Sequence, residues 1–343
     1  VFTIFTYKDA KKQKIESSEE EIKVEKVFPK AFVLLGLGIA LLYFGAVLTI
    51  DNAVILAQSF GLSERLIGIT VIAIGTSLPE LAVAIEAVAQ NEPDIAVGGV
   101  LGSNVANVML VLGTACMLGS GDEAGAGIRR DSVAVILATV LLTAFVYYGS
   151  IPLEGGVFML ILLVSYYTYA YLSSKGKADA EEPEETWLPD NILLAVFATI
   201  AGGVMIWQGA IFLLDGATGL AATYEIPTAI VGLSLVALGT SLPELAVTLI
   251  AAMRNQGGVA VGNVLGSNVM NILGILGTAS VIGGGIEIAS KFEGRDIWVV
   301  ILTSSLVAAM LLDDREIGRR VGATMVIGYI AYMSFLYYST TLG

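Results

Sequence analysis

Long apolar runs separated by short polar breaks occupy most of the chain from residue 31 onward. Each run approaches the length of roughly 20 residues that an α-helix needs to cross the hydrocarbon core of a bilayer. Ten runs can be read, at residues 31–50, 65–89, 95–119, 132–149, 155–174, 191–214, 226–253, 258–284, 296–313 and 319–340. The pattern therefore predicts an all-α membrane protein with ten transmembrane helices.

Two polar stretches frame these runs. Residues 1–30 contain a charged run of Lys and Glu, which indicates an N-terminal polar tail or linker. Residues 175–190 combine many charges with Gly and Pro, and a segment of this kind is not buried in hydrocarbon. We therefore interpret 175–190 as a central loop that separates a first five-helix repeat, at 31–174, from a second one at 191–343.

The two units share one sequence pattern. Placing each residue against the residue 164 positions later aligns 65–113 with 229–277 without a gap, and 25 of the 49 aligned positions are identical. Five helices per unit is an odd number, so the second copy enters the membrane from the opposite side. The sequence thus predicts inverted repeats related by a pseudo-two-fold axis in the membrane plane, an architecture that transporters use for alternating access.

The strongest motif, Gly-Thr-Ser-Leu-Pro-Glu, lies inside the second helix of each unit, at residues 75–80 and 239–244. Proline lacks an N–H and clashes with the carbonyl four residues earlier, so we expect each helix to break there and to free backbone carbonyls. Carbonyl, hydroxyl and carboxylate oxygens suit a hard cation such as Ca²⁺ or Na⁺. The alternative is a capping box of Ser77 and Glu80, which would restart the helix without any ion. A mid-membrane carboxylate costs roughly 2.5–3.5 kcal/mol, and its presence in both units favours the cation site.

A second motif follows in each unit, at residues 98–107 and 262–271. It places Ser103 and Asn107 four residues apart, and therefore on one helical face, and it does the same for Ser267 and Asn271. These side chains could supply further oxygen ligands. The alternative is a packing seam of small residues in which Asn links neighbouring helices. Packing and coordination are compatible, and the sequence leaves both open.

Composition narrows the function. The 343 residues are 56% hydrophobic, and only 14% are charged. One cysteine and no histidine exclude a disulfide framework and the ordinary zinc or haem sites, so we expect no resident cofactor. A net charge of −13 argues against nucleic-acid binding.

Two carboxylates about 5 Å apart repel by roughly 3 kcal/mol at an effective dielectric near 20. One divalent cation, two monovalent cations or protons would each neutralise the two carboxylates. Because these ions would occupy the same ligands in turn, the movement of one ion across the membrane would be coupled to the opposite movement of the other.

The paired motifs resemble the two alpha-repeats of the calcium/cation antiporter superfamily, specifically of its prokaryotic sodium/calcium exchangers. The resemblance covers roughly residues 31–343 and implies that the first and sixth helices slide across a core formed by the motif helices. It also implies that Glu80 and Glu244 are central Ca²⁺ ligands shared with Na⁺. The other ligands implied are Thr76, Ser77, Thr240 and Ser241, the carbonyls of Ala73 and Ala237, the outer Na⁺ ligands Ser103 and Ser267, and Asn107 and Asn271 beside the central site.

Two positions depart from the family's pattern. Some members, including potassium-dependent ones, have Asp where this chain has Asn271, which argues against potassium co-transport. Gly99 corresponds to Asn263, whereas family members often keep Asn in both repeats, and this difference breaks the symmetry beside the site.

Three further acidic residues lie near the motifs. Asp51 and Asp215 are also 164 residues apart. We expect them at the ends of the first and sixth helices, as solvated interfacial residues or as vestibule residues that attract cations. Glu86 has no acidic counterpart in the second unit, and we interpret it as peripheral.

These features predict a secondary-active antiporter, not an enzyme, that exchanges Ca²⁺ for Na⁺ by alternating access. A proton-coupled calcium exchanger, with H⁺ as the coupling ion, is the alternative. An intramembrane hydrolase and a passive cation channel remain as further readings. No nucleophile is specified for a hydrolase, however, and paired inverted breaks suit alternating access better than an open pore. We expect an integral, multi-pass protein of the plasma (inner) membrane whose partners are Ca²⁺, Na⁺ and the lipid bilayer; its oligomeric state is unknown.

Overall fold

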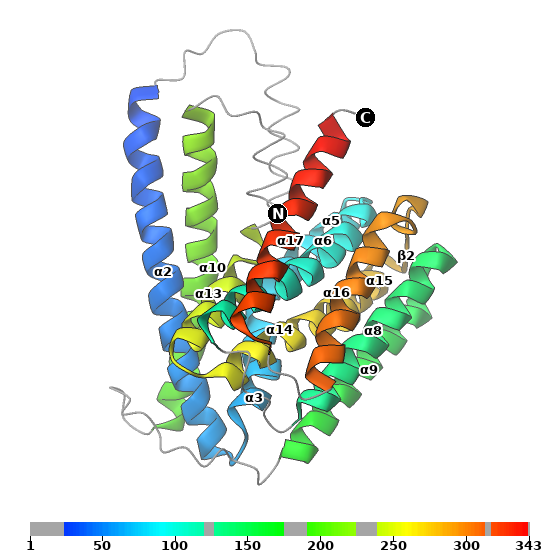
Figure 1. Ribbon diagram of the computed structural model, residues 1–343, viewed down its shortest axis with the longest axis horizontal. Helices are drawn as coiled ribbons and strands as arrows, with labels where there is room; N and C mark the ends of the chain where they lie inside the picture. Colours follow the sequence, from blue (N-terminus) through cyan, green and yellow to red (C-terminus); the bar gives the residue numbers. More distant parts are fainter. Residues whose placement is uncertain (1–23, 120–126, 175–190, 224–238, 313–316, 342–343) are drawn as a thin grey trace.

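The computed structural model describes residues 24–119, 127–174, 191–223, 239–312 and 317–341, and helices make up almost all of this part of the chain (Figure 1). Seven of the described helices are long and apolar enough to cross a membrane, or eight if the bent pair Glu64–Thr76 and Leu78–Ala89 is one span. A helical membrane protein is thereby confirmed, whereas the count of ten helices stays a prediction. Of the tail predicted at 1–30, residues 24–30 instead begin helix α2, so the tail boundary at 30 is wrong. Residues 1–23 and the central loop at 175–190 lie outside the described residues.

The described helices fall on the predicted runs. In the first unit they are α2 (Val24–Ser59), α3 (Glu64–Ile67), η1 (Gly68–Ile72), α4 (Ala73–Thr76), α5 (Leu78–Ala89), α6 (Pro93–Ala106), η2 (Asn107–Leu112), α7 (Gly113–Leu118), α8 (Ile128–Tyr148) and α9 (Leu153–Ser174). In the second unit they are α10 (Ile192–Thr223), α13 (Leu242–Met253), α14 (Gly257–Val269), η4 (Met270–Leu276), α15 (Gly277–Gly283), η5 (Ser290–Phe292), α16 (Arg295–Leu312) and α17 (Arg319–Thr341). The segments η1, η2 and η4 are π-helical, and η5 is a 3₁₀ turn.

The helix ends differ most in α2, which ends nine residues later than the predicted boundary at 50 and contains Asp51 and Asn52. Polar residues do not end this helix because they bond to its own backbone. The Asn52 side-chain amide donates to the Leu48 carbonyl at 2.7 Å, and the Ser59 hydroxyl donates to the Ile55 carbonyl at 2.8 Å. Side chains satisfied within one helix allow that helix to continue.

A seam of glycines joins α2 to α10, which stand as a long pair at one side of the molecule (Figure 1). A Cβ atom added to Gly45 would lie 2.8 Å from the Gly202 carbonyl oxygen, and one added to Gly209 would lie 2.9 Å from the Gly38 carbonyl oxygen. Any side chain would collide at these distances, so glycine is what allows the two backbones to touch. The order of the contacts along the seam shows that the helices run antiparallel.

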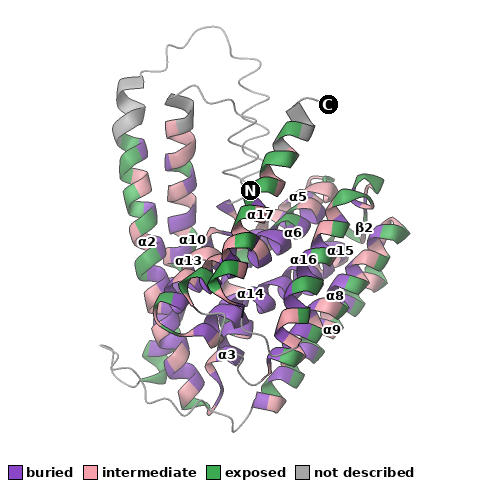
Figure 2. Ribbon diagram, in the orientation of Figure 1, coloured by how far each residue is buried: buried purple, intermediate pink, exposed green. Residues whose placement is uncertain are grey.

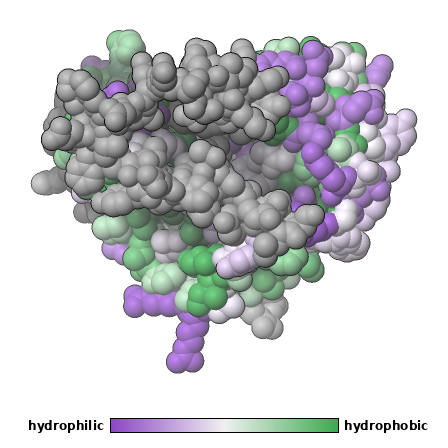
Figure 3. Space-filling model, turned by 90° about the horizontal axis from the view of Figure 1, so that it is seen from above, coloured by the Kyte–Doolittle hydropathy of each residue, from purple (hydrophilic) through white to green (hydrophobic). Residues whose placement is uncertain are grey.

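The centre of the molecule is the continuous helical stretch α14–η4–α15. The most apolar part of this stretch is buried throughout, and the centre of Figure 2 is accordingly purple. The outer helices instead expose large apolar side chains such as Leu137, Val164 and Leu302, each more than 60% exposed. Seen from above, hydrophilic residues gather along one edge of the molecule (Figure 3). Apolar residues on the outside of a buried centre are expected where lipid is the solvent.

Two short strands are an exception to the all-α prediction. The strands β1 (Ser150–Pro152) and β2 (Gly285–Glu287) pair antiparallel and connect the first unit to the second. Each follows a helix that ends at a glycine with left-handed backbone, Gly149 with φ 83° and Gly284 with φ 68°. Glycine adopts this conformation without the strain that a side chain would add. The chain therefore turns out of each helix at the level where the two strands meet.

Candidate cation-binding site

The first motif helix breaks at the predicted place. It ends at Thr76 and restarts at Leu78 with a bend of 44°, and the linking residue Ser77 has φ −86° and ψ 3°. Its counterpart Ser241 has φ −89° and ψ 5° and directly precedes α13, whereas residues 224–238 lie outside the described residues. The proline rule therefore accounts for the break in the first unit and for the matching backbone at Ser241.

The carbonyl of Ala73, expected as an ion ligand, already accepts a hydrogen bond from the Ser77 amide at 3.1 Å. It also lies 3.3 Å from the Thr76 hydroxyl, whose single hydrogen has a second acceptor, Asn263 Oδ1, at 3.2 Å. A role of Ala73 as a ligand therefore requires that its oxygen serve both the Ser77 amide and the ion. The corresponding Ala237 lies outside the described residues.

Ser77 holds the position of a helix cap without acting as one. Its side chain makes no capping hydrogen bond to α5. Instead, the Ser77 hydroxyl donates at 3.1 Å to Oε1 of Glu244, which belongs to the other unit. The capping-box alternative therefore fails for Ser77, and the two motifs meet directly.

The second motif contributes two buried asparagines at repeat-related π-helical segments. η2 begins at Asn107, and η4 begins one residue before Asn271. Neither asparagine has any exposed surface. π-Helical turns inside α-helices occur frequently at functional sites, since the inserted residue redirects the side chains that follow. A hydrogen bond of 3.0 Å from Asn271 Nδ2 to the Ser103 hydroxyl again joins the two units.

Several buried oxygen atoms around the motifs have no hydrogen-bond partner among the described residues. They are both carboxylate oxygens of Glu80, Oε2 of Glu244, the hydroxyl of Ser241 and the side-chain carbonyl oxygens of Asn107 and Asn271. Buried oxygens left unpaired cost free energy, and a hard cation that takes 6–8 oxygen ligands would satisfy them. Among the described residues no three acidic, histidine or cysteine side chains gather. A cation here would therefore contact two carboxylates and otherwise neutral oxygens.

The structure buries nearly all of the predicted ligands that it describes. Those with at most 7% exposed surface are Ala73, Thr76, Ser77, Glu80, Ser103, Asn107, Ser241, Glu244, Ser267 and Asn271. Thr240 is half-buried. The Thr76 and Ser267 hydroxyls are 3.5 Å apart, so the first motif of one unit meets the second motif of the other.

Two hollows reach this group from different helices. A cleft of about 400 Å³ lies between α5, α6, α16 and α17, and Ser103 and Thr240 are among its lining residues. A smaller cavity of about 240 Å³ lies between the α2–α10 pair and the broken helices, where it reaches Thr76. Thr240 and Thr76, which correspond in the two units, therefore border different hollows.

Comparison with known proteins agrees with this geometry. The sodium/calcium exchanger protein family matches residues 30–172 and 194–338. The chain belongs to this family. The inner membrane protein YrbG of Escherichia coli is 33% identical over 321 residues, which cover 90% of this chain and 97% of YrbG. The sodium/calcium exchanger MaX1 of Methanosarcina acetivorans is 29% identical over 345 residues, which cover 90% of this chain and 98% of MaX1.

A solved structure of the sodium-calcium exchanger NCX_Mj superposes on this chain with a TM-score of 0.77, and the two sequences are 30% identical. The match covers 90% of this chain and 98% of the NCX_Mj chain. The resemblance to prokaryotic sodium/calcium exchangers that the motifs suggested is therefore confirmed. The chain is an integral, multi-pass membrane protein of a cation-exchanger family, and its relatives MaX1 and NCX_Mj are named sodium/calcium exchangers.

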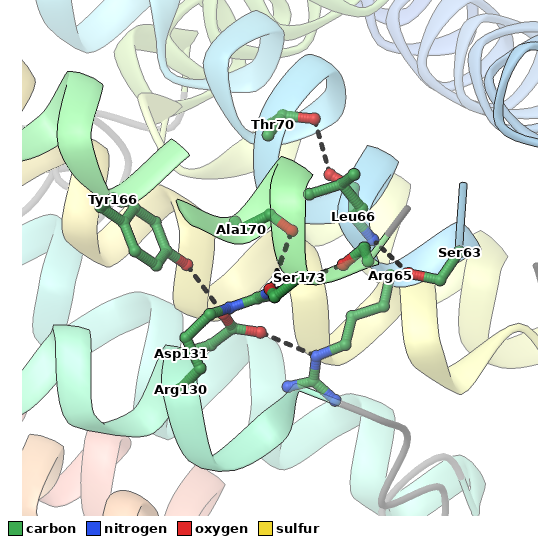
Figure 4. Close-up of polar contacts among 10 residues, drawn as sticks. Ser63, Arg65, Leu66, Thr70, Arg130, Asp131, Tyr166, Ala170 and Ser173 are labelled. Atoms are coloured by element: carbon green, nitrogen blue, oxygen red, sulfur yellow. Dashed lines mark hydrogen bonds and ion pairs between the residues drawn. The ribbon is translucent and has the colours of Figure 1, made fainter. Parts of the chain in front are cut away.

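A buried charged cluster, which the sequence reading of this exchanger missed, holds α3 against α8 and α9 (Figure 4). Asp131 has no exposed surface and accepts hydrogen bonds from Arg65 Nε at 2.9 Å, Arg130 Nε at 2.6 Å and the Tyr166 hydroxyl at 3.1 Å. Arg130 also donates to the Ala170 carbonyl at 3.1 Å. The cluster thus fixes the start of the broken helix that carries the first motif.

The second unit repeats three members of this cluster. Arg295 Nε lies 2.9 Å from Asp296 Oδ1, to which the Tyr332 hydroxyl donates at 3.5 Å. The Arg-Asp pair recurs after 165 residues and the tyrosine after 166, whereas the position that corresponds to Arg65 is Ala229. Extending the repeat alignment with single-residue gaps would have revealed the pattern.

The other acidic residues have different surroundings from those predicted. Asp51 lies inside α2 rather than at its end, and it forms an ion pair with Arg254 at the end of α13. Asp215 lies inside α10 and is exposed. The predicted helix-end positions are therefore wrong for both. Glu86 accepts a hydrogen bond from Gln90 at 2.5 Å on its own helix segment, away from the motif contacts.

Proposed function

We propose that this chain is a secondary-active antiporter that exchanges Ca²⁺ for Na⁺ by alternating access. The observation that carries the proposal is the group of unpaired buried oxygens that surrounds Glu80 and Glu244. Two carboxylates with neutral oxygens suit one Ca²⁺, and the same ligands divided between two halves suit Na⁺. Mutually exclusive occupancy would couple the movement of one ion to the opposite movement of the other.

The proposed scaffold is a pair of inverted five-helix repeats. α13 and α17 would complete the ten helices. Two of the contacts between the units, Ser77–Glu244 and Ser103–Asn271, support a site formed where the units meet. The proposed ligands are the predicted set, including Thr240 and Ala237. Ca²⁺ and Na⁺ are substrates in this proposal, and no resident cofactor takes part.

Na⁺ is proposed as the coupling ion because MaX1 and NCX_Mj are both named sodium/calcium exchangers. The inner-membrane name of YrbG supports a plasma (inner) membrane location. Protons remain the alternative coupling ion, because a pair of facing carboxylates also accepts protons.

Uptake of ⁴⁵Ca²⁺ into proteoliposomes loaded with Na⁺ tests the proposal. We expect uptake that requires an outward Na⁺ gradient, that disappears with equal Na⁺ on both sides and that is lost in Glu80→Gln. Uptake that ignores Na⁺ but follows a pH gradient would assign H⁺ as the coupling ion. Flux that persists at full rate in Glu80→Gln would contradict the proposed site.

A further inference from the structure

The site has two repeat-related halves, one around Thr76 and the other around Thr240. These two halves differ in their hydrogen bonds. In the better satisfied half, the Thr76 hydroxyl donates to Oδ1 of Asn263 at 3.2 Å. The Asn263 amide in turn donates to the Thr248 hydroxyl at 3.0 Å and approaches the Glu244 carbonyl oxygen at 3.5 Å. All four residues are at least 95% buried. The Thr248 hydroxyl therefore fixes the amide nitrogen of Asn263, and the Oδ1 of the same side chain faces the Thr76 hydroxyl.

The corresponding half lacks every member of this chain except the threonine. Thr240 corresponds to Thr76, but Gly99 stands in place of Asn263 and Ala84 in place of Thr248. No heavy atom of the described residues lies within 4 Å of a Cβ added to Gly99. Thr240 and Gly99 both line the 400 Å³ cleft. The space that an asparagine would fill is thus part of the cleft.

The neighbouring motif residues show the same imbalance. Ser77 donates to Glu244, whereas the corresponding Ser241 hydroxyl and both oxygens of Glu80 have no partner among the described residues. Ser241 and Glu80 are therefore less well satisfied than Ser77 and Glu244.

The orientation of a hydroxyl decides how well it binds a cation. A threonine oxygen that coordinates an ion must turn its hydrogen away from the ion, because the hydrogen carries positive charge. At Thr76 that hydrogen has two acceptors, Asn263 Oδ1 at 3.2 Å and the Ala73 carbonyl at 3.3 Å. When the Ala73 carbonyl turns to an ion, Asn263 Oδ1 is the acceptor that remains for the Thr76 hydrogen. At Thr240 no described residue offers an acceptor in the same place, so ion binding must order the hydroxyl, and ordering costs free energy.

We propose that Asn263 is a positioning residue that prepares Thr76 for cation binding, and that Gly99 leaves Thr240 without this support. The half of the site that contains Thr240 is then the half that binds Na⁺ more weakly. This inference rests on the proposed function, since it takes both threonines as Na⁺ ligands.

Exchanging the two positions tests the proposal. Asn263→Ala removes the acceptor, and Gly99→Asn adds one to the opposite half at a position with free space. The measurement is the Na⁺ concentration that gives half-maximal ⁴⁵Ca²⁺ efflux, together with the maximal rate. A parallel Na⁺ titration of the unfolding temperature in detergent reports binding without transport, because a ligand that binds only the folded protein stabilises it.

We expect Asn263→Ala to raise the half-maximal Na⁺ concentration about fivefold while the maximal rate stays within about twofold, since one hydrogen bond is worth about 1 kcal/mol. Gly99→Asn should lower that concentration, and the double variant should fall between the single ones. Thr248→Val should weaken Na⁺ binding in the same direction as Asn263→Ala but less. Thr139→Val is the matched control, because the Thr139 hydroxyl bonds only to Val135 of its own helix.

An unchanged half-maximal Na⁺ concentration in both Asn263→Ala and Gly99→Asn would overturn the inference, as would weaker Na⁺ binding in Gly99→Asn. If Asn263→Ala fails to fold, Gly99→Asn alone decides. A wild-type protein that binds Na⁺ without exchanging Ca²⁺ would contradict the proposed function, and the unfolding titration would then decide the role of Asn263 on its own. A wild-type protein that does not respond to Na⁺ would overturn both.

Discussion

The two Arg-Asp-Tyr clusters allow one substitution to be compared in two environments. Asp131→Asn and Asp296→Asn make the same chemical change at repeat-related positions. Asp131 is fully buried between Arg65, Arg130 and Tyr166. Asp296 pairs with an arginine whose side chain is 40% exposed. The two variants should therefore differ in the free energy of unfolding, and the direction of the difference follows from burial.

The magnitude follows from the partners that remain. In Asp131→Asn, the two guanidinium groups of Arg65 and Arg130 lose their only buried carboxylate partner, and removal of one member of a buried pair costs about 3–5 kcal/mol. An ion pair near the surface contributes only about 0–1 kcal/mol, because solvent screens it. We therefore expect Asp131→Asn to be the less stable variant by about 3 kcal/mol.

Denaturant unfolding in cation-free detergent micelles, followed by helical circular dichroism, measures this difference. A further variant, Asp131→Asn combined with Arg65→Met, should lose less stability than the two single changes added together, because removing Arg65 also removes an uncompensated charge. Equal destabilisation by Asp131→Asn and Asp296→Asn would refute the reasoning from burial.

Three further predictions concern the site and its supports. Glu80→Gln and Glu244→Gln should each abolish Na⁺-driven ⁴⁵Ca²⁺ uptake, because either change removes a charge that neutralises the ion; retained uptake in one of them would exclude that residue as an essential ligand. Ser77→Ala should lower the free energy of unfolding of the cation-free protein by about 1.5–3 kcal/mol, as expected for a hydrogen bond to a charged group, whereas Ser241→Ala has no such bond to lose. Equal losses for the two serines would contradict the one-sided contact. Gly202→Ala should lower the free energy of unfolding by about 1–3 kcal/mol through overpacking, because its Cβ would lie 2.7 Å from the Gly45 carbonyl oxygen. Gly203→Ala is the control, since a Cβ there has no described neighbour within 4 Å. Equal free energies of unfolding for the two variants would argue against close contact between the α2 and α10 backbones.

Local rules were enough to predict the backbone of the site. The position of each helix break follows from proline chemistry alone. The structure bears it out in the first unit, and in the second unit it gives Ser241 the same backbone conformation directly before α13. The apolar runs likewise gave the helices, apart from their ends. α2 continued past Asp51 because polar side chains can bond to the helix that carries them, and hydropathy does not register such bonds.

Contacts between the units could not be predicted in the same way. The partner of Ser77 depends on how two distant motifs face one another, and the choice of Glu244 over a local cap is a tertiary effect. The sequence did show that Gly99 and Asn263 differ, but not that Asn263 connects Thr76 to Thr248. The Arg65–Asp131 cluster escaped notice because the ungapped repeat ends before α8.

The number of residues that separates equivalent positions of the two units changes along the chain, and it determines which segments can be exchanged between the units. The interval is 164 residues through both motifs, 165 at the Arg-Asp pair and 166 at the tyrosine of each cluster. A chimera that exchanges segments within 65–113 and 229–277 therefore preserves the length of each unit. An exchange that extends to Asp131 and Asp296 changes the length of each unit by one residue, and an exchange that extends to Tyr166 and Tyr332 changes it by two. The interchangeable module of this transporter is thus the pair of motif helices rather than the whole five-helix unit.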